Sequence, residues 1–293
     1  MANPSEVIVR YGQMRLLGEF QGLPGQDHPR GQKVVVRTER GHELGEVLCP
    51  VTEQTKELLE PAILGEVIRV ANATDHSVAE SLQSQQRTAF RICEEMIQAR
   101  KLQMDLVDVE AILGGERLVF YYLSEKRVDF RELVKDLARS FRTRIEMRQI
   151  GVRDEAKLLA DYGDCGKPVC CNTHLFQMPP VTMRMAKLQK TTLDPTKISG
   201  RCGRLKCCLR YEFETYLDHE HQLPSLGAWV ETKRGQGWVI AQELLARKVL
   251  IEIDQPERPR ILVGIDQILA SEPRRASSRS NQEAEPGDDP FTN

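Results

Sequence analysis

A short cysteine pattern occurs twice between residues 161 and 211 of this 293-residue chain. The first copy spans residues 165–171 (CGKPVCC) and the second spans residues 202–208 (CGRLKCC), so both read C-G-(Lys/Arg)-x-x-C-C. Six of the eight cysteines lie in these two copies. A recurrence over so many matched positions indicates two copies of one thiol motif. The rest of the fold is therefore expected to position these two copies.

The compartment decides how these thiols are interpreted. The N-terminus has no basic segment followed by an apolar run, and no apolar stretch approaches the roughly 20 residues that span a bilayer. The sequence therefore predicts a cytoplasmic protein without membrane insertion, where reduced thiols serve metals or catalysis rather than disulfides. Neighbouring Cα atoms lie about 3.8 Å apart, below the usual disulfide range of about 4.4–6.8 Å, so Cys170–Cys171 and Cys207–Cys208 are not expected to be disulfides.

The motifs are best suited to metal binding. Four thiolates fill a tetrahedral zinc site or hold an iron–sulfur cluster. Each motif supplies three, which leaves two arrangements open: one internal four-thiolate site with two spare thiols, or two half-sites that another chain completes. The four-residue gap is longer than that of common zinc knuckles, which weakens a plain zinc interpretation. The candidate ligands are Cys165, Cys170, Cys171, Cys202, Cys207 and Cys208.

Other uses of these residues are less well supported. Free cysteines often behave as small buried apolar residues, and we expect this of Cys49 and Cys93. A thiol-redox enzyme would be expected to carry C-x-x-C, which the chain lacks. A cysteine hydrolase needs a positioned histidine, and His174 is expected to be a surface residue. Lys167, Arg204 and Lys206 lie within the motifs and favour the thiolate form. The sequence thus favours a non-enzymatic protein.

Charge is distributed unevenly although the net charge is only −2. Basic residues gather in two runs, of which the shorter comprises Arg139, Arg142, Arg144, Arg148 and Arg153. Such runs are usually solvated faces, but they can also contact RNA phosphates or an acidic partner. Aromatic residues are not interleaved with these cations, so base-specific readout is not indicated. The main run has one acid, Asp194, and eight basic residues: Arg184, Lys187, Lys190, Lys197, Arg201, Arg204, Lys206 and Arg210.

The predicted fold class is α+β. Residues 63–152 should contain strands near 66–71, 105–113, 116–123 and 144–150, with helices over 76–102 and from Asp129 to about 141. This β-α-β-β-α-β order is typical of a ferredoxin-like domain. The aromatic run Phe120–Tyr122 is assigned to its core. The remaining predicted parts are an N-terminal β-rich module (1–62), the cysteine-rich module (153–222), a C-terminal SH3-like β module (223–270) and a disordered tail (271–293).

The flanking modules are predicted from shorter patterns. Strands near 6–10, 14–20, 33–38 and 43–49 suggest a small barrel or sandwich. Strands near 226–233, 237–242, 248–254 and 260–265 suggest a second one. Between the cysteine motifs, a short helix over 181–190 is expected to be broken by Asp194-Pro195.

At the cysteine motifs and three further segments the chain resembles the YaaT (RicT) family, whose members share a PSP-type C-terminal domain. The resemblance covers roughly residues 6–270 and is most specific at the second cysteine motif. Sequence around the first motif, at 161–164 and 172–174, departs from the family pattern, and the tail lies outside it. The matching segments are TERGHELGEV (38–47), residues 129–158, CGKPVCC (165–171), residues 185–188 and PTKISGRCGRLKCCLRY (195–211).

The resemblance implies a cytoplasmic bacterial regulatory protein. Family members form a complex with RicA and RicF that binds iron–sulfur clusters of the four-iron type. That complex acts with the endoribonuclease RNase Y in transcript maturation and influences sporulation, competence and biofilm formation. The six motif cysteines match those of the family one by one. We therefore expect a regulatory adaptor that binds or shares iron–sulfur clusters and modulates RNA processing, with a zinc-stabilised nucleic-acid-binding module as the alternative.

Overall fold

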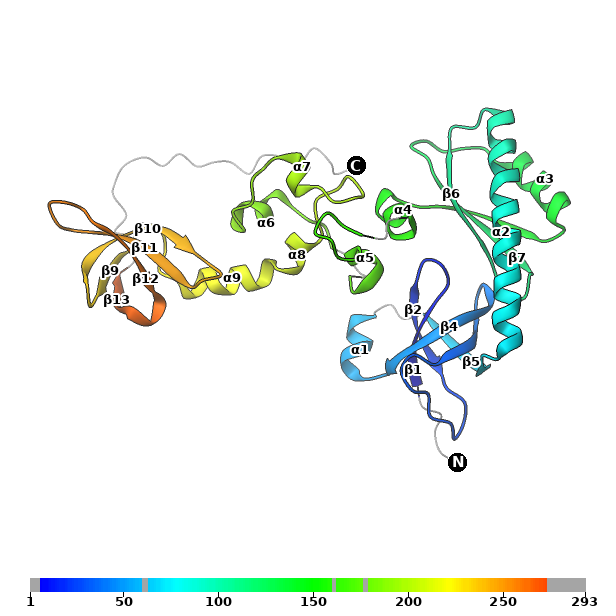
Figure 1. The fold of residues 1–293 in the computed structure, drawn as a ribbon, viewed down its shortest axis with the longest axis horizontal. Coiled ribbons are helices and arrows are strands. Elements are labelled where there is room, and N and C mark those ends of the chain that lie inside the picture. Colours follow the sequence, from blue (N-terminus) through cyan, green and yellow to red (C-terminus); the bar gives the residue numbers. More distant parts are fainter. Residues whose placement is uncertain (1–5, 60–62, 160–161, 176–178, 273–293) are drawn as a thin grey trace. The chain divides into compact units, whose positions relative to one another are not determined.

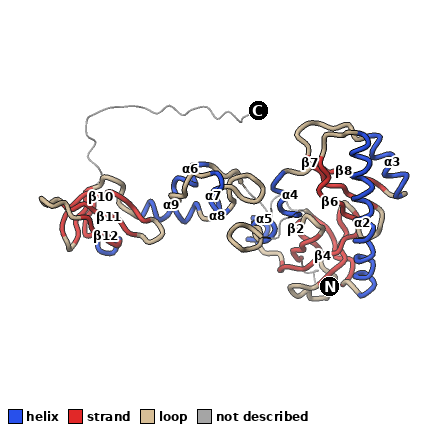
Figure 2. The backbone as a smooth tube through the Cα atoms, turned by 45° about the horizontal axis from the view of Figure 1, so that its top comes forward, coloured by secondary structure: helices blue, strands red, loops and turns tan. Residues whose placement is uncertain are grey.

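The structure is a computed structural model that describes residues 6–59, 63–159, 162–175 and 179–272 (Figure 1). The chain divides into two compact units. Unit 1 comprises Met1–Val181 and Asp194–Cys207, and unit 2 comprises Thr182–Leu193 and Cys208–Asn293. The tube in Figure 2 shows strands and helices in both units, which agrees with the predicted α+β class. Within the described residues, no helix is long and apolar enough to cross a membrane.

Unit 1 begins with a closed five-stranded barrel in the order β1-β2-β5-β3-β4. Valines and two aromatic rings fill its interior, because alternate residues of each strand point inward. The short helix α1 (Glu53–Leu58) follows β4 and is capped by Thr52. The sequence-based prediction of a barrel or sandwich is thus resolved in favour of a barrel. Its strands are β1 (Glu6–Tyr11), β2 (Leu16–Gln21), β3 (Lys33–Thr38), β4 (Gly41–Pro50) and β5 (Leu64–Val70).

A three-stranded sheet follows in unit 1. It consists of β6 (Asp105–Ala111), β7 (Arg117–Leu123) and β8 (Arg144–Gln149), with β6 antiparallel and β8 parallel to β7. Apolar side chains of α2 (Ala73–Arg100) and α3 (Arg131–Phe141) pack on one face of the sheet. The other face has its own buried cluster, which includes Met14 and Ile150. The run Phe120–Tyr122 is buried between these layers, so its assignment to the core is confirmed.

The order of elements is the predicted one, but a ferredoxin-like sheet is not confirmed. The strand predicted near 66–71 forms as β5, yet it pairs with β2 and β3 and closes the barrel. In the barrel, Val67 is the one buried residue of this strand. A parallel strand in a helix-covered sheet would be buried on both faces. In the absence of β5, β8 takes the parallel position beside β7.

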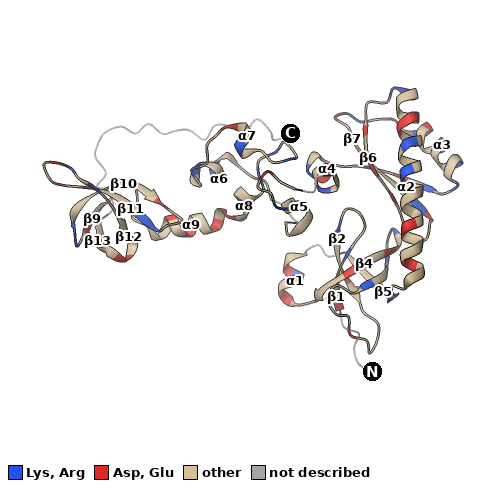
Figure 3. Cartoon of the chain, viewed as in Figure 1, with Lys and Arg blue, Asp and Glu red and all other residues tan. Residues whose placement is uncertain are grey.

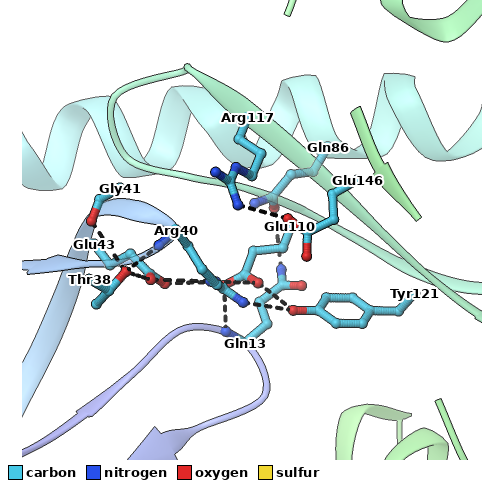
Figure 4. A network of polar contacts seen from close by, with 10 residues as sticks. All are labelled: Gln13, Thr38, Arg40, Gly41, Glu43, Gln86, Glu110, Arg117, Tyr121 and Glu146. Atoms are coloured by element: carbon cyan, nitrogen blue, oxygen red, sulfur yellow. Dashed lines mark hydrogen bonds and ion pairs between the residues drawn. The ribbon is translucent and has the colours of Figure 1, made fainter. Parts of the chain in front are cut away.

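A buried polar network connects the barrel to the sheet within unit 1 (Figure 4). Arg40, in the β3–β4 turn, has one guanidinium nitrogen 2.7 Å from a carboxylate oxygen of Glu43 and 2.7 Å from one of Glu110. It also donates to the Tyr121 hydroxyl at 3.1 Å, and that hydroxyl donates to Glu110 at 2.6 Å. The backbone N–H of Gln13 donates to Glu110 at 2.8 Å. One arginine therefore balances two buried carboxylates from the two parts of the unit.

Unit 2 contains a five-stranded sheet in the order β12-β11-β10-β9-β13. Leu188 of α6 (Met183–Leu188) and Tyr216 of α9 (Phe213–Gln222) pack against its core. The four strands predicted here are confirmed, and a fifth was missed because it overlaps the predicted tail at Ser271 and Glu272. The rest of that tail, 273–293, lies outside the described residues. The strands are β9 (Trp229–Thr232), β10 (Gly235–Glu243), β11 (Lys248–Ile253), β12 (Arg260–Gly264) and β13 (Ile268–Glu272).

In the described part of the chain, two short helices lie between the cysteine motifs, and the second has a side-chain N-cap. The short helix expected over 181–190 is present as α6. Asp194 and Pro195, predicted to break it, instead begin the next helix, α7 (Pro195–Ile198), because the Asp194 carboxylate caps it and proline is suited to a first helical position. The predicted cap of α3 by Asp129 is wrong: Phe130 is the N-cap, and the Asp129 carboxylate only accepts a hydrogen bond from the Arg131 N–H at 3.2 Å just outside the helix.

Candidate metal–thiolate site

The first cysteine motif forms a tight loop after α4 (Val152–Leu159). We call residues 162–171 the first knuckle. Its ends meet in an isolated β-bridge between Tyr162 and Pro168. Inside it, the Gly163 N–H donates to the Lys167 carbonyl at 2.8 Å, and the Gly166 N–H donates to the Gly163 carbonyl at 3.0 Å. These bonds hold the Cys165 thiol at the exposed tip of the loop.

The second motif repeats this backbone with residue numbers 37 higher. We call residues 199–208 the second knuckle, which is closed by a bridge between Ser199 and Leu205. The Gly200 N–H donates to the Arg204 carbonyl at 2.8 Å, and the Gly203 N–H donates to the Gly200 carbonyl at 2.9 Å. The two cysteine motifs are therefore structural repeats as well as sequence repeats.

Glycine is required inside both knuckles for backbone reasons. Gly166 and Gly203 have φ angles of 75° and 73°, a region that other L-residues rarely adopt. A Cβ at either position would meet nothing within 4 Å, so the constraint is conformational rather than steric. The equivalent Gly163 and Gly200 extend the repeat to G-x-C-G-(Lys/Arg)-x-x-C-C, two positions more than the sequence interpretation recognised.

A short helix begins at the cysteine pair of each knuckle. Cys170 and Cys171 open α5 (Cys170–Thr173), while Cys207 immediately precedes α8 (Cys208–Tyr211), which starts at Cys208. The boundary between unit 1 and unit 2 falls between Cys207 and Cys208. All of the motif cysteines except Cys165 are half-buried thiols.

The part of the second knuckle that belongs to unit 1, residues 199–207, contacts the first knuckle. Arg201 forms an ion pair with Asp164 at 3.4 Å and donates to the Tyr162 carbonyl at 3.3 Å. The thiols of Cys171 and Cys202, one from each knuckle, are close enough for their charges to interact. Among the residues that the structure describes, no three His, Cys, Asp or Glu side chains are gathered closely enough to hold a metal ion. The structure thus brings together two of the predicted ligands, but no four-ligand set.

Cations from outside the motifs flank this thiol pair. Burial raises the pKa of Cys171, and the nearby Cys202 adds to the rise, while Lys157 and Arg153 offset part of it. Both basic residues belong to α4, which packs against α5. Sequence reasoning expected Lys167, Arg204 and Lys206 to act on the thiols and missed Lys157. Its spacing of 14 residues from Cys171 gives no local signal; only the packing of α4 on α5 reveals it.

The structure does not gather the eight basic residues of 184–210 in one unit. Lys197, Arg201, Arg204 and Lys206 belong to unit 1, whereas Arg184, Lys187, Lys190 and Arg210 belong to unit 2. Several have local roles: Lys190 donates to the Gln242 carbonyl, and Arg210 lies 3.4 Å from Glu214. Figure 3 shows basic and acidic residues interspersed along α2 and on α4. Arg201 also has a local partner, Asp164. The interpretation of the basic run as a solvated face therefore fits Lys190, Arg201 and Arg210, which all interact with nearby groups of the chain itself.

The two cysteines outside the motifs are packed against the fold. Cys93 is fully buried in the α2–sheet core, and Cys49 on β4 is half-buried. Burial raises the pKa of Cys93 to about 12, so at pH 8 its thiolate is a very small fraction. We expect iodoacetamide to modify the exposed Cys165 in the native metal-free protein and to leave Cys93 unmodified until urea unfolds the chain. Peptide mass spectrometry measures both, and equal native rates would contradict the burial of Cys93.

The donor set itself fits a thiolate-ligated centre. Six thiols in two matched loops, with cations nearby, provide the soft anionic ligands that iron–sulfur clusters and zinc require. His174, three residues beyond the first motif, is the C-cap residue of α5 and is exposed, with its ring nitrogen 2.9 Å from the Thr173 hydroxyl. The prediction that His174 is a surface residue is confirmed.

Comparison with known proteins places these features in a family. The PSP1 C-terminal conserved region matches residues 65–150, from β5 to the end of the three-stranded sheet. The third domain of PSP1-like proteins matches residues 180–223, which include the second knuckle. No solved structure matches the chain.

Two curated proteins share sequence with it. An uncharacterised protein of Schizosaccharomyces pombe is 31% identical over 140 residues, covering 39% of this chain and 19% of that protein. The stage 0 sporulation protein YaaT of Bacillus subtilis is 44% identical over 225 residues, covering 77% of this chain and 82% of that protein. With that extent of identity added to the two PSP1 matches, the chain belongs to the YaaT family of PSP1 proteins.

Proposed function

We propose that the protein is a non-enzymatic regulatory adaptor whose two knuckles bind or share an iron–sulfur cluster of the four-iron type and which modulates RNA processing. The observation that carries this proposal is the pair of matching thiol loops that contact each other in unit 1. None of the six motif cysteines belongs to a hydrophobic core cluster of the described residues, so core packing does not account for the two matching loops.

The thiolates would be the ligands of that cluster. Cys171 and Cys202 are the first candidates, since they already lie near each other, and the remaining thiols supply further ligands on each side. We infer that a second chain supplies the ligands that the two knuckles lack. When bound, a four-iron cluster supplies one-electron redox chemistry and a rigid cross-link between its ligands. In this proposal, the regulatory activity of the adaptor depends on whether the cluster is bound.

Family membership supplies the expected partners. The named relative is a stage 0 sporulation protein, so we propose a role in the regulation that precedes sporulation or in its equivalent in the source organism. The resemblance to the YaaT family points to RicA-like and RicF-like proteins as the chains that complete the cluster sites, and to RNase Y as the enzyme whose transcript processing is modulated. This complex would act in the cytoplasm.

A zinc-stabilised nucleic-acid-binding module is the second candidate. It is favoured by the exposed Arg204 at the tip of the second knuckle and by Lys197 just before it, since cations beside a metal loop suit phosphate contacts. Zinc would use the same thiolates, in a tetrahedral site.

The proposal is tested by anaerobic purification, first of the chain alone and then of the chain co-expressed with RicA-like and RicF-like proteins. We expect a coloured complex whose iron and sulfide contents match, and whose colour is lost on exposure to air. A colourless protein with stoichiometric zinc in both preparations would replace this proposal with the second candidate. Preparations free of metal in both cases would refute both candidates.

A further inference from the structure

A basic cavity opens on the barrel of unit 1, away from the cysteine motifs in sequence. It has a volume of about 330 Å³. The turn between β1 and β2, the strands β3 and β4, and the first turns of α2 contribute its lining. Its charged lining residues are Arg10, Arg15, Lys33 and Glu46, so three cations face one carboxylate, and His76 adds a titratable ring.

The single carboxylate is already occupied. Glu46 lies 3.0 Å from a guanidinium nitrogen of Arg10 and 2.9 Å from the ammonium nitrogen of Lys33. Hydrogen bonds from these two cations lower the pKa of Glu46, which keeps it ionised at neutral pH. One negative charge between two positive ones leaves a positive excess before Arg15 is counted. The cavity therefore has a net attraction for anions.

Arg15 forms no salt bridge in the described ranges of the chain, unlike Arg10 and Lys33. Its Nε is buried and has no hydrogen-bond partner among the residues that the structure describes, although buried guanidinium nitrogens are nearly always paired. Arg10 lies within charge-interaction range of it, as does Lys157 of α4, and Glu46 is the acid that opposes them. Burial and this neighbouring positive charge lower the pKa of Arg15.

The backbone of Arg15 is also unusual. Its φ is 49°, in the left-handed region that residues other than glycine and asparagine rarely adopt. The turn that imposes this angle is closed by the Arg15 N–H donating to the Gly12 carbonyl at 3.0 Å. Glycine would adopt this conformation more readily. An arginine held there, with an unsatisfied donor beside two other cations, resembles the strained positions found at binding sites.

We propose that this cavity binds a phosphate group through Arg15, Arg10 and Lys33. A phosphate carries the negative charge that the cavity lacks, and its oxygens accept the donors that the guanidinium of Arg15 offers. The volume lies at the lower end of the range of about 300–1,000 Å³ common for ligand pockets. The phosphate belongs either to single-stranded RNA or to a free nucleotide. This proposal does not rest on the metal proposal, because none of the residues that line the cavity is a cysteine.

The test uses the full chain at low ionic strength with two probes: a fluorescein-labelled eight-nucleotide oligouridylate and uridine monophosphate. Arg15→Gln keeps the backbone strain but removes the guanidinium, and we expect it to weaken binding at least fivefold. If the probe is RNA, the slope of log K against log salt also falls by about 0.7 for the lost phosphate contact. Arg37→Gln is the matched control, since Arg37 lies on β3 and pairs with Glu66 at 3.5 Å outside the cavity.

A second variant separates binding from folding. Arg15→Gly relieves the left-handed backbone, so we expect its melting temperature to equal or exceed that of the wild type while phosphate binding is lost. Binding of the oligomer but not of the mononucleotide identifies RNA as the source, and equal binding identifies a nucleotide. The proposal is overturned if the wild type binds neither probe at millimolar concentration, or if Arg15→Gln and Arg37→Gln bind alike.

Discussion

We expect Cys202→Ser to release the metal from the anaerobically prepared complex and to leave the second knuckle without fixed structure. Cys202 of that knuckle lies within charge-interaction range of Cys171 of the other one, so we expect its loss to separate the two ligand sets. Structural zinc contributes roughly 10–16 kcal/mol in small peptides, which is comparable to the total stability of about 5–15 kcal/mol of a domain. We therefore expect metal content below a tenth of the wild-type value, with Cys207→Ser behaving in the same way.

Metal analysis and hydrogen exchange across residues 199–208 measure these two effects together. Cys49→Ser is the matched control, because Cys49 is also half-buried but lies on β4, outside both knuckles. That variant should retain its metal and show unchanged exchange in the second knuckle. Full metal content in both Cys202→Ser and Cys207→Ser would remove these two residues from the ligand set.

Arg40→Met is expected to have the second largest effect, this time on folding. The side chain of Arg40 is 11% exposed, and those of Glu43 and Glu110 are 3% and 6% exposed. Methionine fills similar volume but leaves two buried carboxylates without their cation. Removing one partner from a buried ion pair typically costs about 3–5 kcal/mol. Urea unfolding at pH 7 measures the loss. Arg37→Met, which breaks the exposed pair with Glu66, should cost under about 1 kcal/mol.

The pH dependence of this deficit has a defined sign. Burial already raises the pKa of Glu43 in the wild type, and loss of Arg40 removes the charge that opposes that rise. A carboxyl whose folded-state pKa is raised stabilises the fold below its unfolded pKa, about 4.3, and this contribution is lost as pH rises through the folded-state value. The deficit of Arg40→Met should therefore be largest near neutral pH and shrink as pH falls toward 4. A deficit that is equal at pH 4.5 and pH 7.5 would argue against an uncompensated carboxylate at Glu43.

Local patterns were sufficient for most elements of this fold. The 28-residue helix α2 and the strands around Phe120 follow from hydrophobic periodicity, and the consecutive valines of β3 predict a strand of a small barrel or sandwich. Pairing partners did not follow, because strand β5 has the same local pattern whether it joins a barrel or a sheet. Its assignment depends on long-range contacts, which a periodicity argument does not contain.

The candidate sites show the same division. The cysteine repeat predicts the two knuckles, since the glycines at the left-handed positions are adjacent to the thiols in sequence. Lys157 and Arg15 were missed, because each acts on groups that are distant in sequence and only the packing of α4 and the barrel brings them near. The basic run at 184–210 was predicted as one strip, yet its members divide between two units.

The measurement that tests the central claim most directly is X-ray absorption at the metal edge of the anaerobically purified complex. A metal–thiolate centre held by the two knuckles predicts a first shell made of sulfur at about 2.3 Å. A variant in which all six motif cysteines are serine should show no bound metal at all. A first shell of nitrogen and oxygen atoms, or a metal edge that persists in the six-serine variant, would contradict the assignment of these cysteines as ligands.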